Sequence, residues 1–277
     1  MTNPAAPEAF FLPVLNGQRF CVYHPAAGKA STKAFLYVHP FAEEMNKSRR
    51  MANLQSQALA AKGFAVLRID LGGCGDSSGD FGAVTPKNWL DDIELALDWL
   101  RNRSHESIVL WGLRLGATLV LDFAQKKNRW PEEFLLWQPV LNGETFIAQF
   151  LRLRVASEML DGANGGGVRA LRESLRNGES IEVAGYRLNP ELTSYIDSLR
   201  VNKILPKTSQ VNWIEIVSEA NQGIAPAAEQ TINLWRDAQV AVECNTVSGP
   251  TFWATQEITD CAALIEQTTK IFAESRA

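Results

Sequence analysis

The chain has 277 residues, of which 46% are hydrophobic, and this is enough material for one large α/β domain with a sizeable core. Its 27 basic and 31 acidic residues are spread along the chain and leave a formal charge of −4, so no basic run indicates a nucleic-acid partner. No segment reaches the roughly 18 apolar residues of a membrane-spanning helix, and residues 1–7 lack the basic and apolar regions of a signal peptide.

Strands and helices alternate over residues 10–137. An Asn-Gly pair at residues 16–17, between alternating apolar residues, predicts a β-hairpin. The predicted strands of this half are residues 10–14, 18–23, 34–38, 64–69, 107–110 and 134–137. The predicted helices are residues 49–61, capped by Ser48, residues 86–102, opened by Thr85 and Pro86, and residues 115–125. This alternation favours a mostly parallel sheet with helices on both faces, whose site lies beyond the carboxyl ends of the strands.

The alternation breaks between residues 142 and 206. Helices are predicted at residues 143–160, 170–175 and 190–199, with a glycine cluster at 162–167 and a strand-like piece at 182–188. We interpret residues 142–206 as an inserted helical lid over the strand ends; the alternative is a peripheral helical pair away from the site. The pattern then resumes with strands at 211–217 and 240–246 and helices at 226–238 and 259–274, so residues 1–141 and 207–277 are expected to form the core.

Residues 111–117 organise the whole chain. An apolar strand runs into Gly112-Leu113-Arg114-Leu115-Gly116 and then into an apolar helix, which is the layout of a nucleophile elbow. At such an elbow the chain turns so sharply that the flanking positions must be small. The middle residue then lies at the carboxyl edge of the sheet, beside the first free N–H groups of the helix. That residue is usually serine, and here it is Arg114.

Four segments together carry a family resemblance. They read HPFAEEMNKSRR at residues 39–50, DLGGCGDSSG at 70–79, WGLRLG at 111–116 and GPTFW at 249–253. With these motifs the chain resembles the α/β-hydrolase superfamily over essentially its whole length. More specifically, it resembles the proteins called exosortase A system-associated hydrolase 2. The resemblance implies an α/β-hydrolase fold, an esterase-like or thioesterase-like activity, and a bacterial setting of protein sorting and exopolysaccharide production.

The resemblance also implies a Ser-Asp-His triad, and each of its three positions is changed. Arg114 stands at the nucleophile position, and a guanidinium stays protonated and cannot attack a carbonyl. The acid position falls near Gln222, where Glu219 is the nearby acidic residue. The loop that should carry the histidine has none, and Trp253 stands at that position. With His39 at the oxyanion turn, these residues mark where the catalytic machinery is expected.

The features of the hydrolase site that remain in the sequence are those expected to bind a ligand. The turn at Phe41 and the N–H of Leu115 are the expected oxyanion donors, and the helix dipole reinforces the second of them. With Arg114 added, this spot becomes a candidate site for an anionic ligand, because a guanidinium can grip a carboxylate at two points. The alternative is that Arg114 pairs with a carboxylate of its own chain, and both hold if that pair opens on binding. The candidate partners are Glu43, Glu44, Asp76 and Glu219.

Other reactive residues are better explained by structure. His39 could act as a lone base, but it more often shapes the turn. Cys74 has only His39 as a conceivable helper, and a thiol without a histidine is weakly activated. Ser77 and Ser78 are expected to cap the loop or helix. Trp253 is expected to pack where the histidine loop would be, with stacking on a ligand as the alternative.

Cysteine and histidine usage limits cofactor chemistry. The four cysteines lie far apart and form no Cys-x-x-Cys pair, and the chain has three histidines. We therefore expect no metal, no cofactor and no disulfide framework. A reducing cytoplasm is the simplest location.

Three functions follow from these observations. The first is a binding protein that holds a small acyl, ester or carboxylate ligand at the elbow beneath the lid. The second is an active ester or thioester hydrolase that uses a non-standard nucleophile or an activated water. The third is a scaffold that docks a protein partner of the exosortase or exopolysaccharide system through exposed aromatic surface on the lid. The loss of all three triad positions favours the first.

Overall fold

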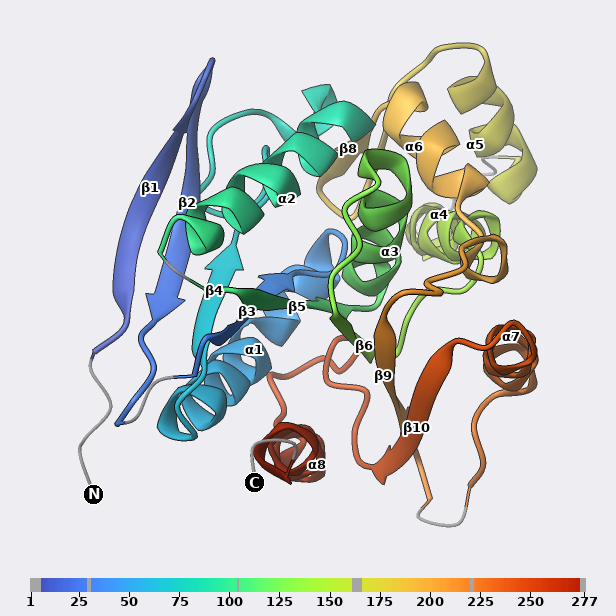
Figure 1. Cartoon of the computed structure of the whole chain (residues 1–277). Coiled ribbons are helices and arrows are strands. Elements are labelled where there is room, and N and C mark those ends of the chain that lie inside the picture. Colours follow the sequence, from blue (N-terminus) through green and yellow to red (C-terminus); the bar gives the residue numbers. More distant parts are fainter. Residues whose placement is uncertain (1–5, 29–30, 104, 161–165, 220–221, 275–277) are drawn as a thin grey trace.

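The computed structural model describes residues 6–28, 31–103, 105–160, 166–219 and 222–274. Its main sheet has eight strands in the order β1-β2-β4-β3-β5-β6-β9-β10 (Figure 1). Their bounds are β1 Glu8–Val14, β2 Gly17–His24, β3 Lys33–Val38, β4 Ala65–Ile69, β5 Ser107–Leu113, β6 Glu133–Trp137, β9 Gln210–Val217 and β10 Ala241–Ser248. Strand β1 pairs antiparallel with β2, and β2 with β4, whereas the remaining pairs are parallel. The predicted hairpin and the mostly parallel sheet are confirmed.

Helices cover both faces of this sheet, as predicted. Helices α1 (Glu43–Ala61) and α8 (Ala262–Glu274) lie against one face, and α2 (Pro86–Arg101) and α3 (Leu115–Lys127) lie against the other (Figure 1). Helix α7 (Pro226–Asp237) packs beside β10. Because neighbouring side chains of a strand point to opposite faces, strands between two helical layers must be apolar on both sides.

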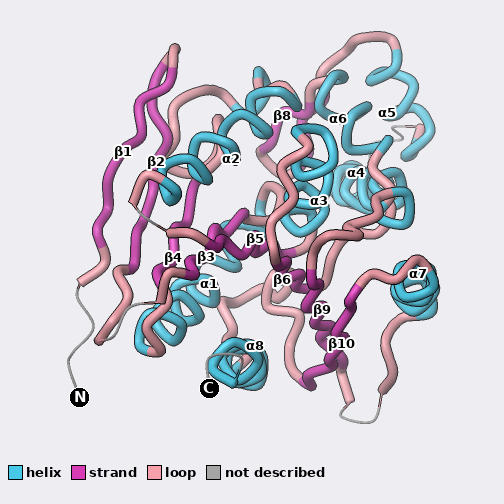
Figure 2. The backbone as a smooth tube through the Cα atoms, in the orientation of Figure 1, coloured by secondary structure: helices cyan, strands magenta, loops and turns pink. Residues whose placement is uncertain are grey.

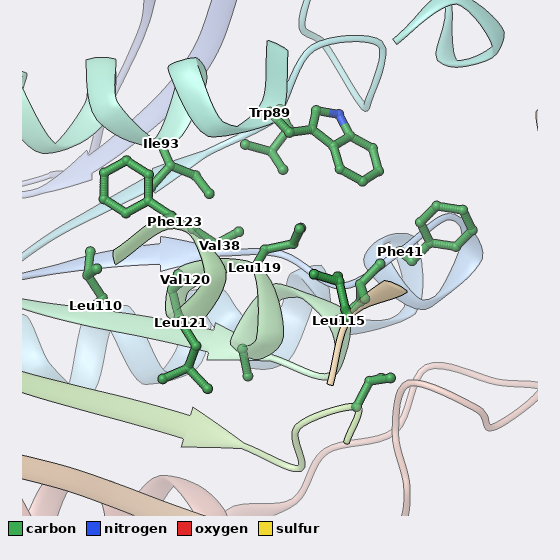
Figure 3. Packing of buried hydrophobic residues seen from close by; sticks show 14 of the residues in the cluster. Val38, Phe41, Trp89, Ile93, Leu110, Leu115, Leu119, Val120, Leu121 and Phe123 are labelled. Atoms are coloured by element: carbon green, nitrogen blue, oxygen red, sulfur yellow. The ribbon is translucent and has the colours of Figure 1, made fainter. Parts of the chain in front are cut away.

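The alternation along β3 shows how the two cores arise. Phe35 and Tyr37 belong to the buried cluster under α1 and α8, whereas Leu36 and Val38 belong to the cluster under α2 and α3. Figure 3 shows side chains of α2, α3 and the strands meeting in the second cluster, with Leu115 of the elbow and Phe41 among them. The elbow is thus fixed between two packed layers.

One predicted helix start and one predicted strand-like piece differ from the structure. Helix α1 begins at Glu43, six residues before the predicted start at residue 49. Ser48 lies inside the helix and its Oγ donates to the carbonyl of Glu44, so it does not cap. Residues 182–188 form the hairpin of β7 (Ile181–Val183) and β8 (Tyr186–Leu188), because Ala184 and Gly185 turn the chain with φ of 49° and 82°.

The segment between β6 and β9 gathers at one end of the sheet beside α3 (Figure 2). It contains α4 (Gly143–Leu160), α5 (Gly167–Arg176), the β7–β8 hairpin and α6 (Pro190–Ser198), and most of the predicted glycine cluster lies outside the described residues. Helix α5 is longer than its predicted range. The two ends of the segment meet, since the N–H of Gly143 donates to the carbonyl of Leu199 at 3.0 Å and that of Val201 to Leu141 at 3.0 Å.

Two side-chain contacts tie this segment to the sheet layers. The Tyr195 hydroxyl donates to Oδ2 of Asp122 on α3 at 2.5 Å. Asn189 donates from Nδ2 to the carbonyl of Val84 at 2.8 Å. Ile147 of α4 is fully buried and belongs to the same apolar cluster as the residues under α3.

The described residues contain no helix that is both long and apolar enough to cross a membrane.

Candidate functional site

The turn from β5 into α3 has the geometry that the sequence predicts for an elbow. Arg114 has φ 55° and ψ −120°, a left-handed conformation that costs a non-glycine residue free energy. A Cβ on Gly116 would lie 2.2 Å from the carbonyl oxygen of Val38, and one on Gly112 would lie 2.4 Å from the Cα of Ala117. Both positions must therefore be glycine for the strand and helix to approach so closely.

Arg114 pairs with Glu44, one of the four carboxylates that the sequence leaves open. Nε and Nη2 of Arg114 both donate to Oε1 of Glu44, at 3.3 Å each. The carboxylate of Glu43 accepts from Asn46 and Tyr186 instead.

The other two candidate partners lie elsewhere. Asp76 is exposed, and its N–H donates to Oδ2 of Asp70 at 3.2 Å. Glu219 is exposed, and its backbone carbonyl accepts from the N–H of Gln222 at 3.0 Å. Neither carboxylate forms an ion pair with Arg114 in the structure. Glu43 and Glu44 both lie in the helix that begins at Glu43, and successive side chains of a helix point in different directions. For this reason Glu44 faces Arg114 and Glu43 does not.

Aromatic rings flank the guanidinium. The Cζ of Arg114 lies 5.3 Å from the ring centroid of Trp253 and 6.0 Å from that of Phe146. These distances are within the range in which an aromatic ring attracts a cation. Trp253, at the predicted histidine position, is buried and stacks edge-on against Phe252 at 5.1 Å. The side chain at the predicted histidine position therefore lies beside the side chain at the predicted nucleophile position.

A cavity of about 400 Å³ opens beside this pair. It lies between the elbow, the start of α1, the helix α4 and the chain at residues 253–254. Its polar lining residues are Glu43, Glu44, Lys47, Arg114 and Gln149. Its larger apolar lining residues are Phe41, Phe146, Phe150, Leu153 and Trp253. The predicted binding residues Phe41, Glu43, Glu44 and Arg114 are thus brought together, whereas Asp76 and Glu219 are not.

The Arg114–Glu44 pair leaves hydrogen-bonding capacity unused. Oε2 of Glu44 is shielded from solvent and has no hydrogen-bond partner in the part of the chain that the structure describes. Nη1 of Arg114 finds no acceptor among the described residues. Burial raises the pKa of the Glu44 carboxyl, and the charge of Arg114 opposes this rise. An unpaired buried acceptor is rare and calls for an explanation.

The predicted oxyanion turn is built by His39. Its Nδ1 contacts the carbonyl of Pro40 at 2.7 Å, and its Nε2 accepts from the N–H of Leu71 at 3.1 Å. Burial lowers the pKa of this imidazole, which is therefore neutral. Because both ring nitrogens are used, His39 shapes the turn and has no nitrogen free for a ligand. Leu115 is completely buried, and its N–H donates to no acceptor among the described residues.

The predicted acid position does not reach the cavity. Gln222 is exposed, and its Oε1 accepts from the N–H and the hydroxyl of Ser218 at 3.2 and 2.8 Å. Neither Gln222 nor Glu219 lines the cavity at the elbow.

A buried carboxylate that the sequence analysis did not single out lies within β9. Glu215 is 4% exposed and accepts from Nε1 of Trp213 at 2.9 Å and from Nε2 of Gln138 at 3.1 Å. Burial raises its pKa, and the charge of Arg114 acts against the rise. The available signal was an acidic residue inside an otherwise apolar strand, which requires partners that only the structure reveals.

The loop at residues 70–79 is held by its own polar groups. Ser77 donates to the carbonyl of Asp70 at 2.5 Å and accepts from the N–H of Phe20 at 2.8 Å. The Cys74 thiol is buried, and this burial, together with the nearby carboxylates Asp70 and Asp92, raises its pKa far above the usual range. It therefore stays protonated and is a poor nucleophile. Within the described residues, no three histidine, cysteine or acidic side chains gather as a metal site would require.

Comparisons with known proteins bear on the family and the fold of this chain. A family model described as serine aminopeptidase S33 matches residues 30–181. Est1E of Butyrivibrio proteoclasticus with ferulic acid bound is 15% identical, over 96% of this chain and 98% of that chain, with a TM-score of 0.65. A highly thermostable carboxyl esterase from Bacillus coagulans in complex with glycerol is 12% identical, over 98% of each chain, with a TM-score of 0.64.

A thioesterase domain from the curacin biosynthetic pathway also superimposes, with 13% identity over 98% of this chain and 99% of that chain and a TM-score of 0.57. At such identities the likeness shows the fold. No curated protein matches the sequence.

Proposed function

We propose that this chain, which belongs to the serine aminopeptidase S33 family of α/β-hydrolases, binds a small acyl, ester or carboxylate ligand at the elbow without the standard triad chemistry. The family match and the solved structures confirm the predicted α/β-hydrolase fold. The observation that carries the proposal is Arg114, a cation at the proposed nucleophile position that lines a cavity and has one donor, Nη1, without an acceptor among the described residues.

The cavity has the composition of a ligand site. Its volume of about 400 Å³ falls in the usual range for such sites, which are mostly apolar with a few convergent polar groups. The aromatic rings of Phe146, Phe150 and Trp253 line the space beside Arg114. In such surroundings a hydrogen bond from the guanidinium to a carbonyl or carboxylate oxygen is stronger than in water.

Residues 142–206 would act as a lid over this ligand. Helix α4 supplies Phe146, Phe150 and Leu153 to the wall of the cavity, which supports a lid over a peripheral position. The exposed large apolar side chains in the described part of this segment are Leu153, Met159 and Leu160, none of them aromatic. The scaffold hypothesis therefore lacks the exposed aromatic surface that it requires.

The family motifs support a more specific proposal for the cellular location and the partner. The resemblance to exosortase A system-associated hydrolase 2 would place the protein in a bacterial cytoplasm, with a partner from the exosortase or exopolysaccharide system. Est1E, which shares the fold, holds ferulic acid, an aromatic carboxylic acid that matches the ligand class proposed here.

Calorimetric titration of ferulate tests the proposal. We expect the native protein to bind, Arg114→Ala to lose binding and Arg114→Lys to retain part of it, because lysine keeps the charge but not the planar fork. Arg101→Ala, at the exposed end of α2, serves as the matched control and should bind as the native protein does. Equal affinity in Arg114→Ala would contradict a role for the guanidinium.

A second candidate function is hydrolysis by an activated water, favoured by the unpaired and buried Oε2 of Glu44. Glu44 would take a proton from water while the water oxygen bonds to the ester carbonyl carbon, and Arg114 would stabilise the oxyanion. As the carbonyl re-forms, the bond to the leaving alkoxide or thiolate breaks and that group takes the proton back. Release of p-nitrophenol from p-nitrophenyl acetate, abolished in Glu44→Gln, would support it. A hydrolysis rate equal to the rate in buffer without the protein would leave ligand binding as the only supported function.

A further inference from the structure

The pairing between Arg114 and Glu44 is incomplete on both sides. A well-formed arginine–carboxylate pair uses two nitrogens and two oxygens in parallel bonds. Here one oxygen, Oε1, accepts both bonds at 3.3 Å, which is longer than such charged bonds usually are. Oε2 of Glu44 has no partner, and Nη1 of Arg114 has no acceptor among the described residues. The pair therefore leaves one donor unused and, beside it, one acceptor that is shielded from solvent.

The charges around this pair cancel. Arg114 offsets Glu44, and the other charged lining residues, Glu43 and Lys47, carry one charge of each sign. A free carboxylate that bound to Arg114 would come close to Glu44, and like charges at this distance repel in a poorly solvated site. The wall thus provides both a hydrogen-bond donor and an acceptor, but it presents no net positive charge to a bound anion.

We infer that the head group of the ligand is a carboxamide, an inference that rests on the proposed binding at the elbow. The amide oxygen accepts from Nη1 of Arg114, and the amide N–H donates to the carboxylate of Glu44. An ester or a free carboxylate offers acceptors only, so it would leave Glu44 unpaired. A site built for a donor rejects analogues that lack it, because its own buried group is then left unsatisfied.

Two features of the cavity fit this geometry. Rotation of a glutamate carboxyl about its last torsion meets only a broad and shallow energy profile, so a partial turn brings the shielded Oε2 toward the cavity and the ligand. The rings of Phe146, Phe150 and Trp253 line the same cavity and would pack against the acyl part of an aromatic amide. The raised pKa of Glu44 agrees with a carboxyl group that lacks its full set of donors.

The test compares two ligands that differ only at the head group, ferulamide and ferulate, by calorimetric titration at neutral pH. We expect the native protein to bind ferulamide about tenfold more tightly than ferulate. In Glu44→Gln this order should reverse, since the variant no longer neutralises Arg114 and no longer repels an anion. Glu229→Gln is the matched control, because Glu229 is an exposed glutamate on α7 that does not line the cavity, and it should keep the native order.

Each outcome separates the two proposals. Tighter binding of ferulate than of ferulamide by the native protein overturns the carboxamide inference and leaves the binding function standing. An unchanged order in Glu44→Gln, with a native unfolding midpoint, also overturns it. Failure of both ligands to bind the native protein overturns the inference and the proposed function together. The comparison in the native protein requires no variant, so a Glu44→Gln protein that fails to fold does not affect the decision.

Discussion

Gly116 sets how closely the elbow approaches β3. The carbonyl oxygens of Val38 and His39 would lie 2.2 and 2.5 Å from a Cβ at this position, and both belong to backbone that cannot rotate away. We expect Gly116→Ala to lower the free energy of unfolding by about 3 kcal/mol, the upper end for overpacking a fixed site. Urea denaturation measures this. Gly223→Ala is the control, because a Cβ there would meet nothing within 4 Å; a cost as small as in the control would contradict the close approach.

His24 predicts a dependence of stability on acidity. It is 3% exposed, its Nε2 has no partner within the described ranges of the chain, and burial lowers its pKa from 6.5 to about 4. Between these values the unfolded chain binds a proton that the folded chain does not, so the free energy of unfolding falls as the pH falls. We expect a loss of about 2 kcal/mol between pH 7 and pH 5 from this residue.

The variant His24→Gln isolates this contribution, because glutamine does not titrate. Its free energy of unfolding should fall less steeply than that of the native protein over the same range of pH. The comparison cancels the contributions of His39 and of the carboxylates, which both proteins share. Parallel curves for the two proteins would show that His24 is not the group responsible.

Some residues of the site can be predicted from the sequence, and others cannot. The elbow and its glycines follow from local pattern, since strand, turn and helix are all encoded within a few residues. The partner of Arg114 could not be chosen from the sequence, because Glu43 and Glu44 are adjacent and only the true start of α1 decides which of them faces the elbow. Glu215 was missed because its partners, Trp213 and Gln138, are assembled by strand packing.

At the scale of elements, Asn189 connects the segment that contains α4, α5 and α6 to the rest of the fold. Its Oδ1 caps α6 by accepting from the N–H of Leu192 at 2.8 Å, while its Nδ2 donates to Val84 at 2.8 Å. We expect Asn189→Ala to cost about 1–2 kcal/mol through loss of the cap and the tie. Asn189→Asp keeps the cap acceptor and loses only the donor, so it should cost less.

Hydrogen exchange of the amides in α6 measures both effects. Exchange should be fastest in Asn189→Ala, intermediate in Asn189→Asp and slowest in the native protein. Equal exchange in all three proteins would mean that packing alone holds this helix in place. The experiment also reports whether the tie to Val84 restrains the segment that borders the cavity.

Element boundaries were predicted less well than element types. The sequence at residues 43–48 lacks an evident cap, and α1 begins after Ala42, which adopts φ 51° without a side-chain bond. Such a start leaves no signal of the kind that Thr85 provides for α2, where a capping box is present. The hairpin of β7 and β8 was read as one strand because its turn, Ala184-Gly185, is too short to interrupt the apolar pattern.

For the whole molecule, one buried cluster joins the sheet layers and the inserted segment. Leu119 and Phe123 of α3, Ile147 of α4 and Ile196 of α6 belong to it. We therefore expect the chain to unfold in a single cooperative transition, with equal calorimetric and van't Hoff enthalpies. Differential scanning calorimetry tests this. Two resolved transitions would show that residues 142–206 fold as a separate unit.

The fold as a whole was the most predictable feature. Apolar strands at regular spacing, each followed by a helix, admit few arrangements other than a parallel sheet between two helical layers. The order of the strands and the placement of the inserted segment depend on contacts between distant residues, such as Tyr195 with Asp122, which no local pattern encodes.

The Arg114–Glu44 pair also restricts which mutations can follow one another in evolution. A change of Arg114 to serine would leave Glu44 poorly solvated and without its counter-ion, a loss that commonly costs several kcal/mol. With the triad positions that the family resemblance implies, Trp253 and Gln222 would stand where the histidine and the acid are expected, so serine alone would not complete a triad. Any mutational path to such a triad therefore passes through less stable proteins before a catalytic benefit appears.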